Sequence, residues 1–309
     1  VAAVRDRHLA HYREIAEGVQ EMWCSPEQIR ADTIADGEWA NFRAAHAWAL
    51  TTGEFDQAVQ LLFGLHSYTV AKMKLEFDDW ATRTIELGDR EGRTSALLYG
   101  LACVLPFFKG DPAWTVDLAD RCLANAEDED ELAIAMSLTM RSYGLTVLGR
   151  RDEVVAGIGE LRDRIARSVQ PLSRFYLVQP IIDLNLESGG GSGDVEAYAA
   201  SAELIGAPSH MARSKLVLGN WLFLMDPPDI DGTIAACREA RDLADSAGST
   251  EPGTWARSTL ALALVTGSRN EASIAVRESL AWAIDIQIPL VISTNLQTCA
   301  AHLASGPSR

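Results

Sequence analysis

The chain has 309 residues, 48% of them hydrophobic and 23% charged, which are values typical of a folded globular protein. It carries 27 Lys and Arg against 43 Asp and Glu, a formal net charge of −16. Because nucleic-acid binding depends largely on neutralising phosphates, this charge argues against a direct nucleic-acid partner. The five cysteines contain no C-x-x-C pair, which favours reduced thiols in a cytoplasmic protein. No apolar run reaches the roughly 18 residues of a membrane span, so we expect no membrane partner.

The segment EWANFRAAHAWALTTGEFDQA, residues 38–58, is predicted to be helical. Phe42, Ala45 and Ala49 recur at steps of three to four residues, which is typical of a buried helix face. Asn41 and Arg43, beside this stripe, are predicted to fix a helix end or a contact between helices rather than a ligand. We expect the segment to belong to an N-terminal helical bundle formed by residues 1–70.

Turn-forming segments then recur with a period of about 40 residues, which lies in the range of helical-repeat proteins. One set lies near residues 72, 110, 149, 190, 228 and 267, and a second set lies about midway between these positions. The intervals of roughly 20 residues suit one helix and a short turn. The sequence therefore predicts an all-α fold: a tetratricopeptide-like α-solenoid of about fifteen antiparallel helices with a repeat of about 40 residues, continuous over 71–309.

Proline and glycine mark the expected helix boundaries. Pro26, Pro112 and Pro171 are predicted to begin helices, because proline at the first helical position loses no hydrogen bond. We expect left-handed helix ends at three glycines: Gly88, Gly149 and Gly248. The run 284–294 alternates apolar residues as a strand does, but Pro289 falls where the repeat requires a helix start, so a helix is predicted there.

A glycine-rich run near residue 190 raises the question of a nucleotide-binding loop. Gly189-x-Gly191 is followed by Asp194 where the fingerprint requires a third glycine, and no alternation of strands and helices surrounds it. We favour a mobile turn inside a repeat.

The sequence contains no recognisable metal site. His8 and His11 could share a metal, but no third ligand has suitable spacing. The segment 226–232 contains three aspartates but lacks the spacing of a calcium loop, so we interpret it as a turn. The acidic run 127–131 is predicted to open a helix, where negative charge is favourable, with a docking patch as the alternative. We therefore expect no metal, no cofactor and no catalytic residues.

Arginines recur early in the first helices of successive predicted repeats, with aromatic and amide side chains in the same helices. If these helices line a concave surface, the arginines would form an anion-binding groove. The alternative, which we favour, is that each arginine pairs with an acidic side chain of an adjacent helix. The candidate groove residues are Arg93, Tyr99, Arg141, Tyr143, Arg174, Tyr176, Arg213, Asn220, Trp221 and Arg257.

Residues 38–53 read E-x-x-N-F-R-A-A-H-x-W-A-L-x-x-G. This order resembles the E-x-x-N-L-R-A-A-L-x-W-A-L-x-x-G segment of bacterial multidomain regulators of the LuxR-type and ATPase-linked adenylate cyclase kind, signal-transduction ATPases common in actinobacteria. Phe42 and His46 stand where that family usually has leucine. The specific match covers about residues 5–90, with Trp80 in the family's next helix.

In that family the segment follows an ATPase module and a winged helix and opens a tetratricopeptide-like sensor region. The chain has no G-x-x-x-x-G-K-[ST] loop, winged helix or cyclase motif, so the family's ATPase, DNA-binding and cyclase activities do not transfer to it. The resemblance, together with a start at Val1, implies a segment of a longer polypeptide that carries an ATPase or DNA-binding module.

The expected function is a non-catalytic helical-repeat platform. It would bind a protein or peptide partner, or a small anionic effector, and relay this state through changes in curvature that are easy because each repeat touches only its neighbours. The alternatives are an enzyme with its site in the concave groove and a structural module that forms homo-oligomers. An enzyme should show titratable groups converging on one pocket, and an oligomerisation module should expose an apolar patch on a terminal repeat.

Overall fold

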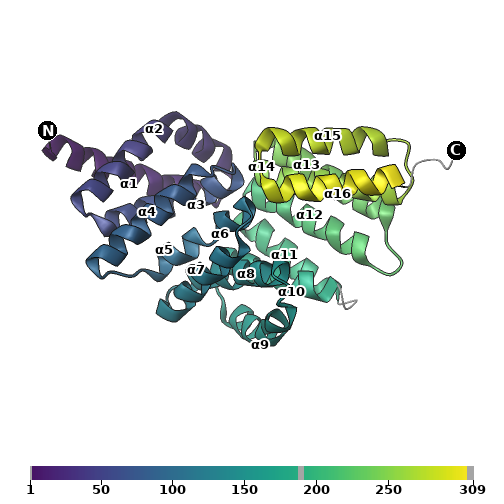
Figure 1. Cartoon of the computed structure of the whole chain (residues 1–309), viewed down its shortest axis with the longest axis horizontal. Coiled ribbons are helices and arrows are strands. Elements are labelled where there is room, and N and C mark those ends of the chain that lie inside the picture. The colour runs from purple at the N-terminus through teal and green to yellow at the C-terminus, as the bar shows by residue number, and fades with distance from the viewer. Residues whose placement is uncertain (1, 187–190, 305–309) are drawn as a thin grey trace.

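The computed structural model describes residues 2–186 and 191–304, apart from the side chains of residues 185 and 186. Within these residues the chain forms helices without strands, which confirms the all-α prediction (Figure 1). The short helices α5 and α6 are separated only by Cys103, so that counting them as one gives the expected fifteen. The helices are α1 (Ala2–Trp23), α2 (Gln28–Thr52), α3 (Phe55–Ala71), α4 (Glu76–Glu91), α5 (Ala96–Ala102), α6 (Val104–Lys109), α7 (Pro112–Asn125), α8 (Glu131–Val147), α9 (Arg151–Arg167), α10 (Pro171–Leu186), α11 (Ser192–Ile205), α12 (Pro208–Leu224), α13 (Ile230–Ser246), α14 (Thr250–Thr266), α15 (Ala272–Ile286) and α16 (Pro289–Ala304).

The second half of the chain is a regular array of helix pairs. Helices α8, α10, α12, α14 and α16 begin at residues 131, 171, 208, 250 and 289, at nearly regular intervals that match the predicted period. Each of them packs against the next, whereas α9, α11, α13 and α15 each pack mainly on the helices that flank them in sequence. Helices α8 and α14 are buried on several sides, but α9 buries only Val154 and Leu161. The array is therefore an α-solenoid with an inner and an outer layer of helices.

Most of the predicted helix boundaries are confirmed. Helices α7, α10 and α16 begin at Pro112, Pro171 and Pro289, so the apolar run near the C-terminus is helical. The predicted start at Pro26 is wrong, because Pro26 lies in the turn before α2. Gly149 and Gly248 follow helices with φ of 73° and 61°. The prediction of a turn in the glycine-rich run falls on positions 187–190, which include Gly189 and lie outside the described residues. The apolar run before them is part of α10.

The predicted helix end at Gly88 is wrong. Helix α4 continues to Glu91, and Gly92 is its left-handed C-cap with φ of 67°. A Cβ at Gly88 would lie 2.7 Å from a ring carbon of Phe55 and 2.8 Å from the carbonyl oxygen of Arg93. Gly88 therefore allows α3 to approach α4 closely.

The segment at 38–53 is a structural joint between helices. Phe42, Ala45 and Ala49 are fully buried in α2, as predicted. Arg43 donates to both carboxylate oxygens of Glu76 at 2.5 and 2.8 Å, which ties α2 to α4 and confirms the predicted contact between helices for this residue. Asn41 instead donates to Glu38 of the same helix at 2.7 Å. The largest core cluster runs from Leu9 through Met140 and includes Val291, so it crosses residue 70 without a break; a separate N-terminal bundle stays a prediction.

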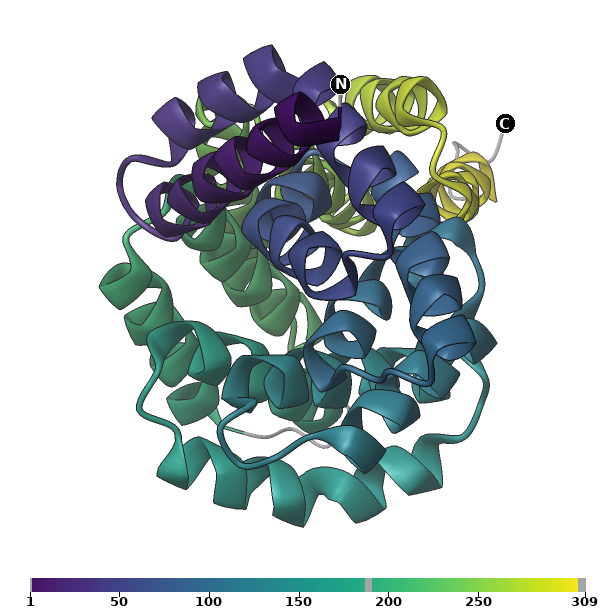
Figure 2. The same cartoon turned by 90° about the vertical axis from the view of Figure 1, so that its left-hand side faces the viewer.

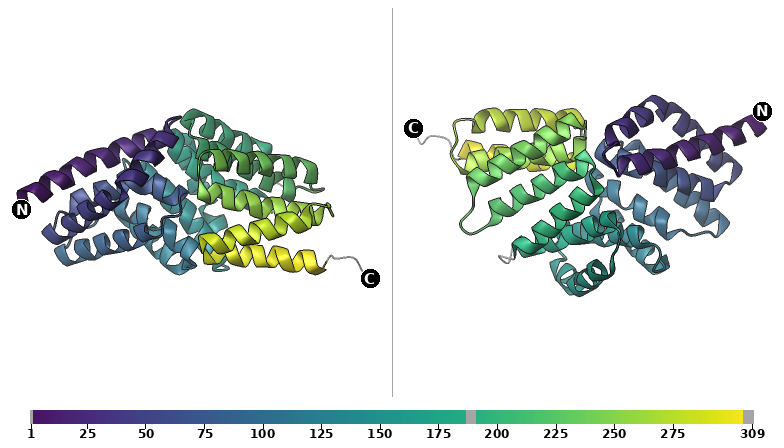
Figure 3. Two further views of the ribbon diagram at one scale, coloured as in Figure 1. Left: turned by 90° about the horizontal axis from the view of Figure 1, so that it is seen from above. Right: turned by 180° about the vertical axis from the view of Figure 1, so that it is seen from behind.

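The superhelix closes on itself. Viewed down the long axis, the chain passes through the blue helices at the right, teal at the bottom and green at the left, then returns at the top beside the first helices (Figure 2). Figure 3 shows the same two halves from above and from behind. The expectation that each repeat touches only its neighbours is therefore wrong, because helix α14 packs on α3 and α16 packs on α6.

A buried amide forms the centre of this closure. Gln28 at the start of α2 donates to the hydroxyls of Ser209 and Ser249 at 2.5 and 3.1 Å and accepts the backbone N–H of Ser209 at 2.8 Å. Lys72 adds a contact to the carbonyl of Gly248 at 2.7 Å. We call these the closing contacts. They join the α1–α2 and α3–α4 connections to the N-terminal ends of α12 and α14.

Candidate functional site

The inner helices bring several ionisable side chains together inside the superhelix. We call this group, Tyr143 on α8, Tyr176 and Asp183 on α10, Arg213 on α12 and Glu251 on α14, the interior polar cluster. Its members lie among buried apolar residues on helices that are packed on several sides. Because few positions on such helices face solvent, polar side chains on them are placed in the interior. Three of them, Tyr143, Tyr176 and Arg213, belong to the predicted groove residues.

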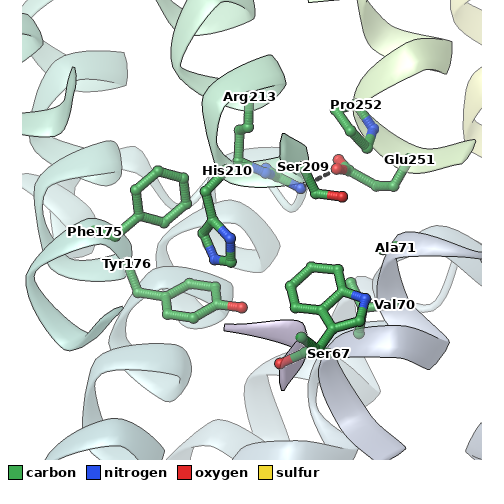
Figure 4. Close-up of a pocket in the computed structure, with 11 residues that line it drawn as sticks. Ser67, Val70, Ala71, Phe175, Tyr176, Ser209, His210, Arg213, Glu251 and Pro252 are labelled. Atoms are coloured by element: carbon green, nitrogen blue, oxygen red, sulfur yellow. Dashed lines mark ion pairs between the residues drawn. The ribbon is translucent and has the colours of Figure 1, made fainter. Parts of the chain in front are cut away.

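Arg213 and Glu251 form an ion pair across α12 and α14, drawn as a dashed line in Figure 4. The Glu251 side chain is 3% exposed and that of Arg213 is 22% exposed. Burial raises the pKa of Glu251, and Arg213 opposes this effect. Burial acts to lower the pKa of Arg213, but Glu251 and the neighbouring tyrosines outweigh it and raise that pKa. The guanidinium therefore stays charged, and its charge is committed to Glu251.

Asp183 and Tyr143 face each other across α10 and α8. Burial raises the pKa of Asp183 to about 6, while Tyr143 and the charge of Arg213 act in the opposite direction. Burial also raises the pKa of Tyr143 well above its usual value. The Tyr143 hydroxyl is buried and has no partner in hydrogen-bonding geometry, although it is near enough to Asp183 to influence its pKa. Both side chains thus retain unused hydrogen-bonding capacity.

A small cavity of about 30 Å³ lies where α1 and α3 meet α10, α12 and α14. Figure 4 shows Tyr176 and His210 on one side of it, with the Arg213–Glu251 pair above. His210 is 5% exposed, and its Nδ1 has no hydrogen-bond partner. Burial and the charge of Arg213 lower the pKa of His210 to about 3, so the ring is neutral. The volume suits one or two water molecules rather than an organic ligand.

A larger cavity of about 260 Å³ lies between α6, α8, α9 and α10, and we call it the Asp183 cavity. Asp183 and Tyr143 line it together with Ser142, Thr146 and Arg151; the remaining walls are apolar. An apolar pocket with a few convergent polar groups and a perturbed pKa is the usual form of a small-molecule site.

Most arginines of the predicted groove form ion pairs with acidic side chains. Arg93 lies in the connection between α4 and α5 rather than in a helix as predicted, and it pairs with Asp56. Arg141 pairs with Asp120 at 2.6 Å, Arg257 with Asp245 at 2.7 Å, and Arg213 with Glu251. Arg257 also lies 4.2 Å from the ring centre of Trp282. Arg174 is exposed and has no acidic partner within 4.0 Å in the described part of the chain. The pairing interpretation therefore describes four of the five arginines.

The other predicted groove residues have structural surroundings. Tyr99 is buried in α5, with the guanidinium carbon of Arg121 5.9 Å from its ring centre. Asn220 accepts a hydrogen bond from Thr259 at 2.9 Å, and Trp221 packs against the core cluster of α10, α11 and α12. These three residues do not line the Asp183 cavity.

Sequence reasoning missed Asp183, Glu251 and His210. A signal for Asp183 was present, because it is the single charge in the apolar run LVQPIIDLNL of α10. Glu251, which precedes Pro252, has the sequence context of an ordinary helix N-terminus. Its burial depends on α12, the inner helix of the preceding pair, and has no local signal.

The described residues contain no group of three or more His, Cys, Asp or Glu side chains that could hold a metal. In the aspartate-rich segment, Asp229 caps α13 by accepting the backbone N–H of Gly232 at 2.9 Å, which is a turn as interpreted. Helix α8 begins at Glu131, so the acidic run lies at and before its positive end. Among the described helices, we find none with the length and apolar character needed to cross a membrane.

Neither a protein-family model nor a curated protein matches the chain.

Proposed function

We propose that this chain is a non-catalytic helical-repeat domain that binds a small effector in the interior of its superhelix. The observation that supports this most strongly is the Asp183 cavity, where an apolar enclosure meets an unsatisfied buried hydroxyl and a carboxylate without an ion pair. The resemblance in residues 38–53 adds the context of a sensor region. In that context the domain reports to an ATPase or DNA-binding module of a longer cytoplasmic polypeptide.

Helix α10 provides the route by which binding is relayed. It carries Asp183 at the larger cavity and Phe175 and Tyr176 at the small cavity, which borders α1 and α3. A ligand that favours one position of α10 therefore favours one arrangement of the closing contacts. The shift can be no larger than the ligand's differential affinity for the two arrangements.

The proposal is tested by thermal melting of the chain with sets of small amines, carboxylic acids and neutral compounds. We expect at least one class to raise the melting temperature, because a ligand that binds only the folded state stabilises it. The Tyr143→Phe variant should reduce that shift. If no compound of any class shifts the melting temperature, the interior is not an effector site.

An enzyme is the second candidate, because ionisable groups converge on one region and the pKa of Asp183 is raised to about 6, close to that of a general acid or base at neutral pH. A catalytic role requires chemical change in a bound compound. Incubation of each stabilising compound with the wild type and with Asp183→Asn, followed by mass spectrometry, separates the two candidates. Unchanged compounds support binding alone, and turnover that depends on Asp183 establishes an enzyme.

Self-association is favoured by one surface feature. Leu296 and Leu303 lie one heptad apart on α16 and are 53% and 81% exposed, with half-buried Ile292 on the same stripe. This stripe is an exposed apolar face on the terminal pair of helices. Light scattering over a concentration series, with Leu296→Glu/Leu303→Glu as the comparison, tests for self-association. A wild-type dimer that is lost in this variant supports an oligomerisation role.

A further inference from the structure

Two hydroxyls in the wall of the Asp183 cavity offer hydrogen-bond acceptors rather than donors. Ser142 donates its hydroxyl proton to the carbonyl of Leu138 at 2.8 Å, and Thr146 donates to the carbonyl of Ser142 at 2.8 Å. A hydroxyl has one proton and two lone pairs, so these side chains retain only lone pairs for a ligand. With the Asp183 carboxylate, the cavity presents three sets of oxygen lone pairs.

The Asp183 carboxylate is not held in an ion pair. It has none within 4.0 Å among the described residues, and Arg213, which acts on it from a distance, is already paired with Glu251. The Tyr143 hydroxyl beside Asp183 also lacks a partner. Leaving this hydroxyl buried and unsatisfied costs free energy that a ligand with a hydrogen-bonding group would recover.

The rest of the wall suits a short hydrocarbon body. Val154, Pro180 and Leu184 line the cavity, and the rings of Phe107 and Tyr143 lie with their centres 5.8 Å apart. Aromatic faces attract cations. The volume of about 260 Å³ is slightly below the roughly 300 Å³ at which pockets for drug-sized ligands begin, so the ligand must be small.

We propose that the Asp183 cavity binds a small primary amine in its ammonium form. The three N–H groups of the ammonium donate to Asp183 and to two of the hydroxyls that line the cavity, and the hydrocarbon chain packs against Phe107 and Leu184. This inference rests on the proposed effector-binding function and names the chemical class of the effector. It replaces the anionic effector expected from the arginine column, because those arginines are largely paired.

Two further observations bear on this assignment. The raised pKa of Asp183 has burial as its main cause, and a bound ammonium would compensate that burial. Arg151 also lines the cavity and has an interaction of its own. Since its charge would favour an anion, the test includes a carboxylate of the same size.

The experiment compares three compounds of matched length, n-butylammonium, 1-butanol and butyrate, by isothermal titration calorimetry at pH 8 and by thermal melting. We expect n-butylammonium to bind most tightly. Asp183→Asn should weaken its binding roughly 10- to 100-fold, the fold-change that corresponds to losing a hydrogen bond to a charged group. Asp242→Asn, which changes an exposed carboxylate outside the cavity, is the matched control and should leave binding unchanged.

Circular dichroism confirms that each variant is folded, and Tyr143→Phe supplies an independent variant should Asp183→Asn unfold. The inference is overturned if n-butylammonium does not bind, if both cavity variants bind it as the wild type does, or if butyrate or butanol binds as tightly. A preference for butyrate, or a shift by acids alone in the wider compound sets, overturns the amine and leaves the effector-binding function standing. The absence of any shift overturns both.

Discussion

Arg213 and Glu251 place two opposite charges inside the superhelix, where each depends on the other. Replacing Arg213 by Met leaves Glu251 buried without its counter-charge, so we expect the free energy of unfolding to fall by about 3 kcal/mol. The double variant Arg213→Met/Glu251→Met should be more stable than the single variant, because no charge is left unpaired. Urea unfolding of the wild type, the two single variants and the double variant measures the coupling energy between the two side chains. Additive losses of stability would show that the pair is not coupled.

Three buried histidines make stability depend on pH. Burial is the main cause that lowers the pKa of His46 and His210 to about 3 and of His66 to about 4. Histidine pKa values in the unfolded chain are near 6.5, so the unfolded chain binds more protons than the folded chain between about pH 3 and pH 6.5. The stability is therefore fully present above about pH 6.5 and declines as the pH falls, by roughly 1–3 kcal/mol per histidine at pH 4.5.

Urea unfolding at pH 7 and pH 4.5 measures this loss. His46→Gln should lose less stability between the two pH values than the wild type, whatever its stability at pH 7. Equal losses in both proteins would show that His46 does not titrate in the way its burial implies.

At the residue scale, the sequence predicted that the arginines form ion pairs, but it did not predict which acidic residue each arginine pairs with. It identified the arginines of the inner helices and favoured their pairing with acidic neighbours, but Arg141 pairs with Asp120 on α7 and Arg213 with Glu251 on α14. To predict whether an arginine pairs with an earlier or a later helix, one must know how each helix is oriented about its own axis. The sequence period does not determine that rotation.

Gly64 shows how closely helices approach in the first half of the chain. A Cβ there would lie 2.5 Å from the backbone carbonyl carbon of Ala16 on α1. We expect Gly64→Ala to destabilise the protein by about 1–3 kcal/mol, because the clash is with backbone. Gly37→Ala on α2, where nothing lies within 4 Å, is the control and should gain about 0.5–1 kcal/mol from reduced chain entropy. Thermal unfolding of both variants checks the contrast, and similar effects would contradict the close approach.

At the element scale, most boundaries were predictable because they depend on local chemistry. Proline at the first helical position and glycine at a left-handed end act within a few residues, as Pro289 and Gly149 show. Gly88 was misplaced because a glycine required for helix packing is indistinguishable in sequence from one that ends a helix. The contact that decides its role is with Phe55, 33 positions earlier.

At the scale of the whole molecule, closure depends on a few buried polar contacts between distant helices. Gln28→Ala removes the partner of the Ser209 amide and one partner of each of two hydroxyls, so we expect a loss of about 1–3 kcal/mol. The amide hydrogen of Ser209 should also exchange faster. Gln297→Ala, on an exposed face of α16, should change stability by no more than about 0.5 kcal/mol. Unaltered exchange at Ser209 in Gln28→Ala would contradict this account of the closure.

The closure itself was not predictable from the repeat pattern. The repeat period specifies how neighbouring helices pair, but small rotations at each step add up to decide whether the ends meet. Gln28 lies 181 positions from Ser209 and 221 from Ser249, and nothing in its own surroundings in the sequence marks it. The Asp183 cavity is likewise a product of four helices and has no motif.

A ligand bound in the Asp183 cavity should stabilise the closing contacts, and amide hydrogen exchange with and without saturating n-butylammonium measures this effect. We expect slower exchange in residues 206–213 and 247–254 of the wild type, and no such change in Asp183→Asn. If exchange in these segments stays the same while the ligand is bound, the cavity and the closing contacts are not coupled.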